Sequence, residues 1–472
     1  MGTMVTKGIR MEGKARIVNP LGRAALVWAG VTVSGLGLAS AQSYKYDFGP
    51  AGATAAAGFT AVNPSQVYSS AAGFGFEKSG VTCESKGTDA LTGDFCTGAF
   101  MFSVKIPQGN YNLTVHFGDP SGTSETTVEA ENRRLLFDRI TTASGQLANR
   151  TITVNRREAK SIDGSVTMTL KDRELGYRTW DEKLTILITG RKSAVAGLEL
   201  TKVDNAITWY LCGNSTVVDQ LDEGWAAWGQ YIPYFLKTGV SIANYAESGL
   251  TAPGFLSMKR LTKLLTEAKP GDFVSVEFGH NDQKNSGDVS GYPNNLKTFV
   301  TQIKAKGCIP IFVTPTAREG DGNPKTSIGG LAEVMRTQAK ALDVAMIDLN
   351  AMVIQLMQAY GTANAHKMYM DGTHFTEIGG YELGRCVAKG VKELNNTMTP
   401  FLTEGAVFDP AKPDPVDFLT TTLQPVALQP SKLGKALQME ILPATIFPDK
   451  QGKPHTADGK RLEAVPERAL SR

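Results

Sequence analysis

The sequence predicts an α/β domain built on a parallel sheet and preceded by an all-β sandwich. Two observations along the 472 residues carry this prediction. From Tyr44 to about Val203, short segments alternate apolar and polar residues between Gly, Asn and Pro, as antiparallel strands do. After Asn205, continuous apolar runs alternate with amphipathic stretches, as in parallel sheets covered by helices on both faces.

The first half shows almost no helical periodicity. Period-two alternation with β-branched residues predicts strands at Tyr111–Phe117, Thr151–Asn155, Val166–Leu170 and Leu184–Ile188. The charged, Thr-rich stretch Asp119–Ile140 is interpreted as a solvated strand pair. Many short antiparallel strands of this kind favour a β-sandwich.

The second half is predicted to form a parallel sheet with helices between its strands. The expected strands are Ile207–Leu211, Val240–Asn244, Phe273–Phe278, Ile309–Thr314 and Ala345–Leu349. Helices are expected at Phe255–Glu267, Tyr292–Lys306, Gly330–Leu342 and about Glu377–Leu394. In such sheets, ligands bind where loops leave the carboxyl ends of the strands.

The first 41 residues have the layout of a secretory signal peptide. Basic residues precede an apolar run, Ala24–Leu38, and Ala39-Ser40-Ala41 follows as a small-residue cleavage pattern. A membrane span needs about 20 apolar residues, so the run is short for one, although a retained anchor is the alternative. We expect cleavage near Ala41, a secreted or periplasmic protein and no stable membrane insertion.

The charge of the chain is concentrated in this leader. The whole chain has a formal net charge of +3, and removing the leader leaves 44 basic and 45 acidic residues, a net charge of −1. Composition therefore gives no support for nucleic-acid binding.

The remaining chain divides into an expected β-sandwich (42–204), an α/β domain (205–400) and a Pro-rich tail (401–472) that packs near its start.

Five cysteines lie outside the leader. Cys83 and Cys96 flank a Gly-, Asp- and Thr-rich loop and can pair in an oxidising compartment. Cys212 is interpreted as a core thiol, and pairing of Cys308 with Cys386 stays open. No spacing resembles a zinc site, and no metal is expected.

A serine follows the first strand of the α/β half. In Gly213-Asn214-Ser215, a hydroxyl at a strand end can act as a nucleophile, and the small residue beside it lets substrate approach the backbone. The alternative is a serine that caps a helix.

A histidine and an aspartate lie three residues apart before the last predicted helix. A hydroxyl nucleophile needs a general base, and the base needs an orienting carboxylate. Asp371 and His374 can meet that need on one loop. Asn281, after the third strand, can donate to an oxyanion, and Gly249, after the second, offers an unshielded N–H. Each of these motifs, taken alone, is better explained as a turn than as part of a site. Four such motifs that follow strands of one predicted sheet indicate a functional site.

These motifs resemble the four blocks of the SGNH (GDSL-type) hydrolase superfamily, and within it the rhamnogalacturonan acetylesterases of carbohydrate esterase family twelve. The resemblance covers roughly residues 206–397, and the region before it resembles a galactose-binding-like sandwich. It implies a flavodoxin-like sheet and ester hydrolysis through an acyl-enzyme on acetylated polysaccharide, without a cofactor. It assigns Ser215 as nucleophile, His374 as base and Asp371 as its partner. Ser215 N–H, Gly249 N–H and the Asn281 side chain form the implied oxyanion hole, with Gly213 and Asn214 in support.

Two positions depart from the family pattern. Asn214 stands where the family has Asp, and a near-isosteric amide still accepts hydrogen bonds but without charge assistance, so reduced activity is predicted. Leu250 and Thr251 follow Gly249, where related esterases often carry Arg-Ser, which leaves the sugar contact there in doubt.

Other interpretations remain open from the sequence. The same machinery can act on lipid or small acyl esters, or the chain can be a carbohydrate-binding protein with a weakened hydrolase domain. Trp225 and Trp228 are better explained by core packing than by stacking on sugars, since helical spacing alone produces an i, i+3 pair. The β-region is equally well explained as a glycan-binding module and as a structural companion.

Overall fold

The computed structural model describes residues 42–285, 289–416, 447–448 and 454–455. The expected signal peptide, 1–41, and most of the C-terminal tail lie outside these residues. The residues described from 42 onward belong to one compact unit. A division at 204 and 400 stays a prediction.

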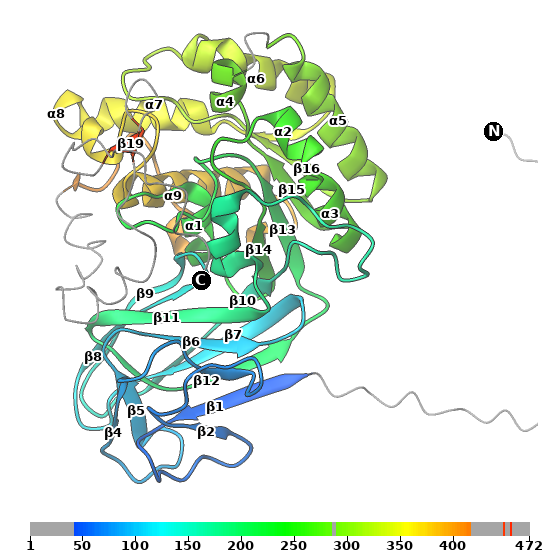
Figure 1. Ribbon diagram of the computed structural model, residues 1–472. Helices are drawn as coiled ribbons and strands as arrows, with labels where there is room; N and C mark the ends of the chain where they lie inside the picture. The colour runs from blue at the N-terminus through cyan, green and yellow to red at the C-terminus, as the bar shows by residue number, and fades with distance from the viewer. Residues whose placement is uncertain (1–41, 286–288, 417–446, 449–453, 456–472) are drawn as a thin grey trace, which may run out of the picture. The chain divides into compact units, whose positions relative to one another are not determined.

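The first half is a β-sandwich of two sheets (Figure 1). One sheet has the order β10-β7-β12-β1-β2, with β5 beside β12 and β4 beside β5, and the other has the order β3-β6-β11-β8-β9. The strands are β1 (Ser43–Phe48), β2 (Thr60–Val62), β3 (Phe74–Phe76), β4 (Thr82–Ser85), β5 (Asp94–Thr97), β6 (Phe100–Lys105), β7 (Gly109–Phe117), β8 (Ser124–Ala130), β9 (Arg134–Thr142), β10 (Ala148–Arg156), β11 (Lys183–Lys192) and β12 (Ala194–Lys202). Their inward-facing apolar residues, among them Phe48, Phe102 and Leu113, form one core.

Two predictions for this half need correction. The strand expected at Val166–Leu170 is absent, because the segment between β10 and β11 makes a single bridge, Lys160 to Thr167, and then leaves the sandwich. Met168 packs instead in a core cluster of the α/β half, and that burial is the reason. The pair within Asp119–Ile140 is present as β8 and β9, but alternate residues of β8 are buried, so the pair is not fully solvated.

The second half contains the predicted parallel sheet. Its strands are β13 (Ile207–Cys212), β14 (Val240–Asn244), β15 (Phe273–Val276), β16 (Ile309–Val313) and β17 (Ala345–Ile347). The order β14-β13-β15-β16-β17, with every pair parallel, is the flavodoxin-like order and confirms the fold class. β15, β16 and β17 end slightly before the predicted limits.

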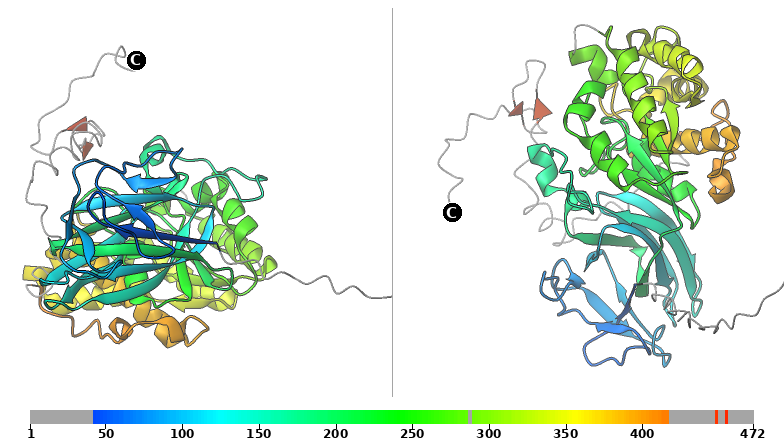
Figure 2. Two further views of the ribbon diagram at one scale, coloured as in Figure 1. Left: turned by 90° about the horizontal axis from the view of Figure 1, so that it is seen from below. Right: turned by 90° about the vertical axis from the view of Figure 1, so that its right-hand side faces the viewer.

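Helices cover both faces of this sheet (Figure 2). On one face, residues of α2, α3, α5 and α6 pack against Tyr210 and Val274, and on the other, residues of α1, α7 and α9 pack against Trp209 and Ile311. The α-helices are α1 (Trp228–Tyr231), α2 (Ala252–Ser257), α3 (Arg260–Glu267), α4 (His280–Asn285), α5 (Tyr292–Ala305), α6 (Leu331–Ala341), α7 (Leu349–Tyr360), α8 (Thr362–Ala365) and α9 (Glu377–Leu394). Short 3₁₀ helices are η1 (Asp172–Gly176), η2 (Arg178–Trp180), η3 (Ile232–Phe235), η4 (Ser327–Gly330), η5 (His366–Met368), η6 (Thr399–Phe401) and η7 (Glu404–Ala406), and β18 (Phe447–Pro448) pairs with β19 (Pro454–His455).

The helix expected at Phe255–Glu267 is broken into α2 and α3. Lys259 takes a left-handed conformation with φ of 59°, which ends one helix and starts the next. α9 has the predicted limits, and the Thr376 hydroxyl accepts from Gly379 N–H to cap it. Among the described residues, we find no helix with the length and apolarity that a membrane crossing requires.

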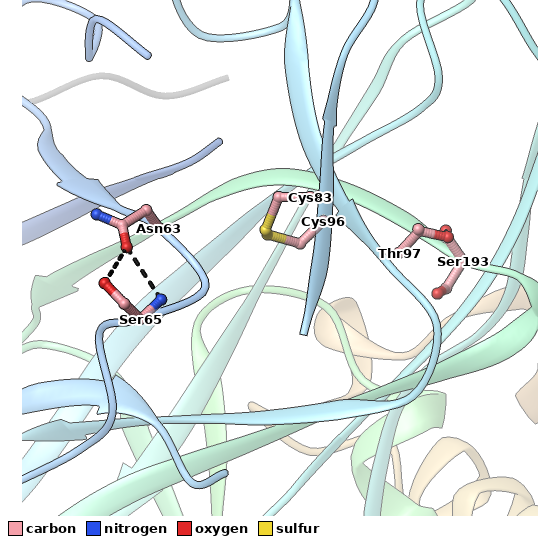
Figure 3. The surroundings of a disulfide bond; sticks show 6 residues. All are labelled: Asn63, Ser65, Cys83, Cys96, Thr97 and Ser193. Carbon is pink, nitrogen blue, oxygen red and sulfur yellow. Dashed lines mark hydrogen bonds between the residues drawn. A yellow bond between two sulfur atoms is a disulfide. The ribbon is translucent and has the colours of Figure 1, made fainter. Parts of the chain in front are cut away.

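Cys83 and Cys96 form a disulfide between β4 and β5 (Figure 3). The two cysteines are register partners in this antiparallel pair, which explains why they meet. Cys212, Cys308 and Cys386 are buried free thiols, so Cys308 and Cys386 are not paired. Nearby, Asn63 accepts from the Ser65 hydroxyl at 2.6 Å and Thr97 donates to Ser193 O at 2.6 Å, which hold the loops around the disulfide.

Candidate active site

Ser215 lies in the turn that follows β13. Val217 N–H and Val218 N–H both donate to Asn214 O at 3.0 Å, and α1 begins only at Trp228. Ser215 therefore does not cap a helix, which was the alternative interpretation. Gly213 is required here, because a Cβ would lie 2.4 Å from Val217 Cγ2.

Ser215, His374 and Asp371 form a continuous hydrogen-bonded chain. Ser215 Oγ lies 2.9 Å from His374 Nε2, and His374 Nδ1 lies 2.8 Å from Asp371 Oδ2. An ionised carboxylate can only accept, so Nδ1 carries the hydrogen and Nε2 offers its lone pair to Ser215. This is the geometry that a hydroxyl nucleophile and its base require.

Asp371 is held ionised. Partial burial favours the neutral carboxyl, but hydrogen bonds from the His374 side chain and backbone outweigh it and lower the pKa of Asp371 to about 2. The carboxylate also accepts from Thr373 N–H at 3.0 Å. A negative charge is thus fixed beside His374 Nδ1, where it stabilises an imidazolium.

Gly249 and Asn281 come from the next two strand ends. Gly249 has φ of +77°, a conformation that side chains disfavour, and is exposed in the loop after β14. Asn281 Nδ2 donates to Leu250 O at 3.0 Å, which joins the two loops. Asp282 reinforces this junction by accepting from Ala252 N–H at 2.9 Å and from Gly279 N–H at 3.0 Å.

Asn214 is fully buried behind the nucleophile. Its Oδ1 accepts from Thr216 N–H at 3.1 Å and lies 3.0 Å from Thr216 Oγ1, while its Nδ2 has no hydrogen-bond partner among the described residues. Thr216 Oγ1 also lies 2.7 Å from Glu277 Oε1. The Thr216 hydroxyl has one hydrogen, which it donates to Glu277 Oε1 or to Asn214 Oδ1.

Glu277 is buried at the end of β15. Burial raises its pKa to about 7, against the opposing hydrogen bonds from Thr216 and Trp228. The sequence motifs alone assign no role to Glu277. A carboxylate that directly follows an apolar strand is the feature that could have marked it, because burial of a charged group there needs partners.

Trp225 is the second residue whose position was not anticipated. Trp209 and Trp228 are fully buried, as core packing predicts, but Trp225 is partly exposed and its ring lies 5.5 Å from the His374 ring. The prediction that both members of the Trp225–Trp228 pair are core residues is wrong for Trp225, because no regular helix joins the two positions.

The surroundings contain a further neutral histidine. Burial, and then the charge of Arg318, lower the pKa of His280 to about 3, and its ring donates to Thr316 O at 2.9 Å. Among the residues that the structure describes, no group of three or more His, Cys, Asp and Glu side chains is placed to hold a metal ion.

Both halves of the chain resemble known proteins. Residues 211–380 match the GDSL-like Lipase/Acylhydrolase family, and residues 44–154 match the galactose-binding-like domain of the beta-agarase/YXIM esterase-like type. Rhamnogalacturonan acetylesterase RhgT of Bacillus subtilis is 34% identical over 207 residues, which cover 39% of this chain and 89% of that protein. The chain belongs to the GDSL-like family. It is a carboxylic ester hydrolase of the SGNH type with a galactose-binding-like N-terminal region.

A longer alignment spans both halves of this esterase. The uncharacterised esterase YxiM of Bacillus subtilis is 25% identical over 382 residues, which cover 75% of this chain and 92% of that protein. The solved structure of the Bacillus subtilis YxiM protein is 22% identical, covers 76% of this chain and all of its own, and gives a TM-score of 0.41.

Proposed function

We propose that this esterase is secreted and removes acetyl groups from pectic polysaccharide of the rhamnogalacturonan type, with Ser215, His374 and Asp371 as its catalytic residues. The observation that carries the proposal is the 2.9 Å contact between Ser215 Oγ and His374 Nε2, with Asp371 behind the imidazole.

Acylation begins with proton transfer from Ser215 to His374. As His374 Nε2 takes the hydroxyl proton, Ser215 Oγ forms a bond to the acetyl carbonyl carbon, and the carbonyl electron pair moves to oxygen. Ser215 N–H, Gly249 N–H and Asn281 Nδ2 are the proposed donors to this oxyanion. The C–O bond to the sugar then breaks, and His374 gives its proton to the leaving sugar oxygen.

Deacylation repeats these steps with water. His374 removes a proton from the water as its oxygen attacks the acetyl-serine carbonyl. Collapse of the second tetrahedral intermediate releases acetate, and His374 returns the proton to Ser215 Oγ.

Two observations support a polysaccharide as substrate. The side chains of His374 and Asp371 are 30% and 46% exposed, so a polymer can reach them without entering a tunnel. RhgT, by its name, acts on rhamnogalacturonan, and it aligns with the part of the chain that carries the site.

The test compares the wild type with Ser215→Ala on acetylated rhamnogalacturonan-containing pectin, acetylated xylan and a nitrophenyl acyl-chain series. We expect acetate release to fall by roughly 10⁴-fold or more in Ser215→Ala. The control variant is Ser257→Ala, which changes an exposed serine of α2 and should release acetate at the wild-type rate. Equal rates for wild type and Ser215→Ala would refute the catalytic assignment. A preference for long acyl chains would instead favour a lipid esterase.

The proposed export rests on the leader and on the Cys83–Cys96 disulfide, since disulfides persist in oxidising compartments. N-terminal sequencing of protein recovered outside the cytoplasm is expected to begin near Gln42. Exported protein that still carries the intact leader would contradict the proposed cleavage near Ala41.

A further inference from the structure

The segment between β10 and β11 leaves the sandwich and packs on the α/β half next to the site. Thr169 N–H donates to Met258 O at 2.9 Å, and Trp180 is buried with its ring 5.4 Å from that of Tyr245. Glu174 of η1 forms a fully buried ion pair with Arg260 of α3. The position of η1 beside the loop after β14 is therefore fixed by buried contacts.

This segment places two cations beside Gly249. Lys171 Nζ donates to Ser248 O at 2.6 Å, and Arg173 Nη2 donates to the same oxygen at 2.6 Å and to Glu247. A Cβ on Gly249 would lie 3.3 Å from Lys171 Nζ, so the ammonium sits directly against this glycine. Gly249 is exposed, and Lys171 is half-buried.

The charge of Lys171 is not neutralised by a carboxylate contact. Glu247 is paired with Arg173 and Glu174 with Arg260, whereas Lys171 forms no salt bridge with any residue that the structure describes. The contact with Ser248 O uses one of its three donors. Burial is the main cause that lowers the pKa of Lys171, so the ammonium has lost part of its hydration and would gain from an anionic partner.

The two residues that follow Gly249 carry no charge. Leu250 is buried and Thr251 caps α2 by accepting from Gly254 N–H at 3.0 Å. The sandwich thus contributes, through the segment before β11, the charge that the two residues after Gly249 lack.

We propose that Lys171, with Arg173 beside it, forms a carboxylate-binding subsite for a uronate residue of the acetylated polysaccharide. This proposal rests on the proposed function and names the feature of the substrate that the site selects. Its geometry places a cation next to Gly249, an exposed glycine whose N–H is also a proposed donor to the oxyanion at Ser215.

A binding experiment tests the subsite without polysaccharide deacetylation. Oligogalacturonate that carries no acetyl group competes with nitrophenyl acetate for the site, and neutral xylo-oligosaccharide of equal length is the control inhibitor. In Lys171→Gln, we expect the inhibition constant of oligogalacturonate to rise roughly two- to fivefold relative to that of the neutral control, the range of a partly exposed ionic contact. Lys171→Arg retains the positive charge, so its inhibition constant for oligogalacturonate is expected to stay close to the wild-type value.

Kinetics on polymers gives the second readout. The ratio of KM for acetylated rhamnogalacturonan to KM for acetylated xylan is expected to rise by the same factor in Lys171→Gln, and added salt should reduce the difference between variant and wild type. Lys340→Gln, an exposed lysine on α6, is the matched control and should leave the ratio at the wild-type value.

Either of two results would refute the proposed subsite. The first is that oligogalacturonate inhibits wild type and Lys171→Gln with equal inhibition constants, or inhibits neither protein. The other is an equal change of KM on acidic and neutral esters, which would mean that Lys171 only supports the loop. Failure of the proposed function is distinct, because it appears as a wild type that hydrolyses nitrophenyl acetate but releases no acetate from pectin.

Discussion

Asn214 illustrates at the residue scale how a family position can be altered and still serve the site. Its amide oxygen accepts from Thr216 N–H, as a carboxylate would. Its amide nitrogen is buried and has no hydrogen-bond partner in the part of the chain that the structure describes, which costs about 1–3 kcal/mol for a group of this kind. An asparagine at position 214 therefore preserves the turn that presents Ser215 but makes that turn less stable.

Asn214→Asp is expected to raise kcat or the stability of the enzyme. The variant removes the unpartnered N–H groups and makes the bond to Thr216 N–H charge-assisted, a gain on the order of two- to tenfold in rate. The new negative charge would raise the pKa of Glu277 further. Measured kcat and melting temperature that both stay at or below wild type would show that Asn214 does not limit this site.

Other residues of the site were less predictable. Ser215, Asp371 and His374 were identifiable because hydroxyl, base and carboxylate stand in motifs at strand ends. Trp225 was assigned to the core from its spacing, since an i, i+3 pair does not reveal that one member precedes a four-residue helix. Lys171 carries no motif, and its role depends on a contact 77 residues along the chain.

At the scale of elements, the sandwich touches the site from two sides. The turn between β8 and β9 places Arg133 against Trp225 O at 3.3 Å and against Glu377, at the start of α9. The segment before β11 holds Ser248 from the other side. These contacts favour a β-region that takes part in the site over a separate glycan-binding module.

The disulfide is expected to stabilise the sandwich without acting on catalysis. Cys83 and Cys96 are 13 residues apart, and closing a loop of this length contributes roughly 2–3 kcal/mol. The double variant Cys83→Ser/Cys96→Ser should melt at a lower temperature but retain kcat/KM on nitrophenyl acetate at 25 °C, because β4 and β5 contribute no residue to the candidate site.

Wild type treated with reductant provides the parallel measurement and should melt like the double variant. A loss of kcat/KM while the protein is still folded would contradict the separation of the disulfide from the site.

At the scale of the whole molecule, several buried carboxyls share one response to pH. Burial raises the pKa of Glu247, Glu277 and Glu382 to about 7 and that of Glu131 to about 8. In the unfolded chain such groups ionise near pH 4.3. Between these values the folded protein holds protons that the unfolded chain has released, so the free energy of unfolding falls as pH rises.

We expect denaturant unfolding to show a decrease in stability from about pH 5 to pH 8. Glu277→Gln cannot titrate and should flatten this dependence by up to about 1.4 kcal/mol per pH unit in the window between the two pKa values. Glu404→Gln, an exposed glutamate in η7, is the matched control and should keep the wild-type slope. Stability that rises over this range would contradict the shifted pKa values.

The sequence by itself determined the fold class, the parallel strands and the motifs at their ends. These follow from local periodicity and from the rule that parallel strands direct their carboxyl ends to one edge. Only the tertiary structure decided that Val166–Leu170 is not a strand, that Trp225 lies beside His374 and that Lys171 reaches Gly249. The physical reason is that these positions are fixed by burial and hydrogen bonds between segments far apart in the chain, which local pattern does not encode.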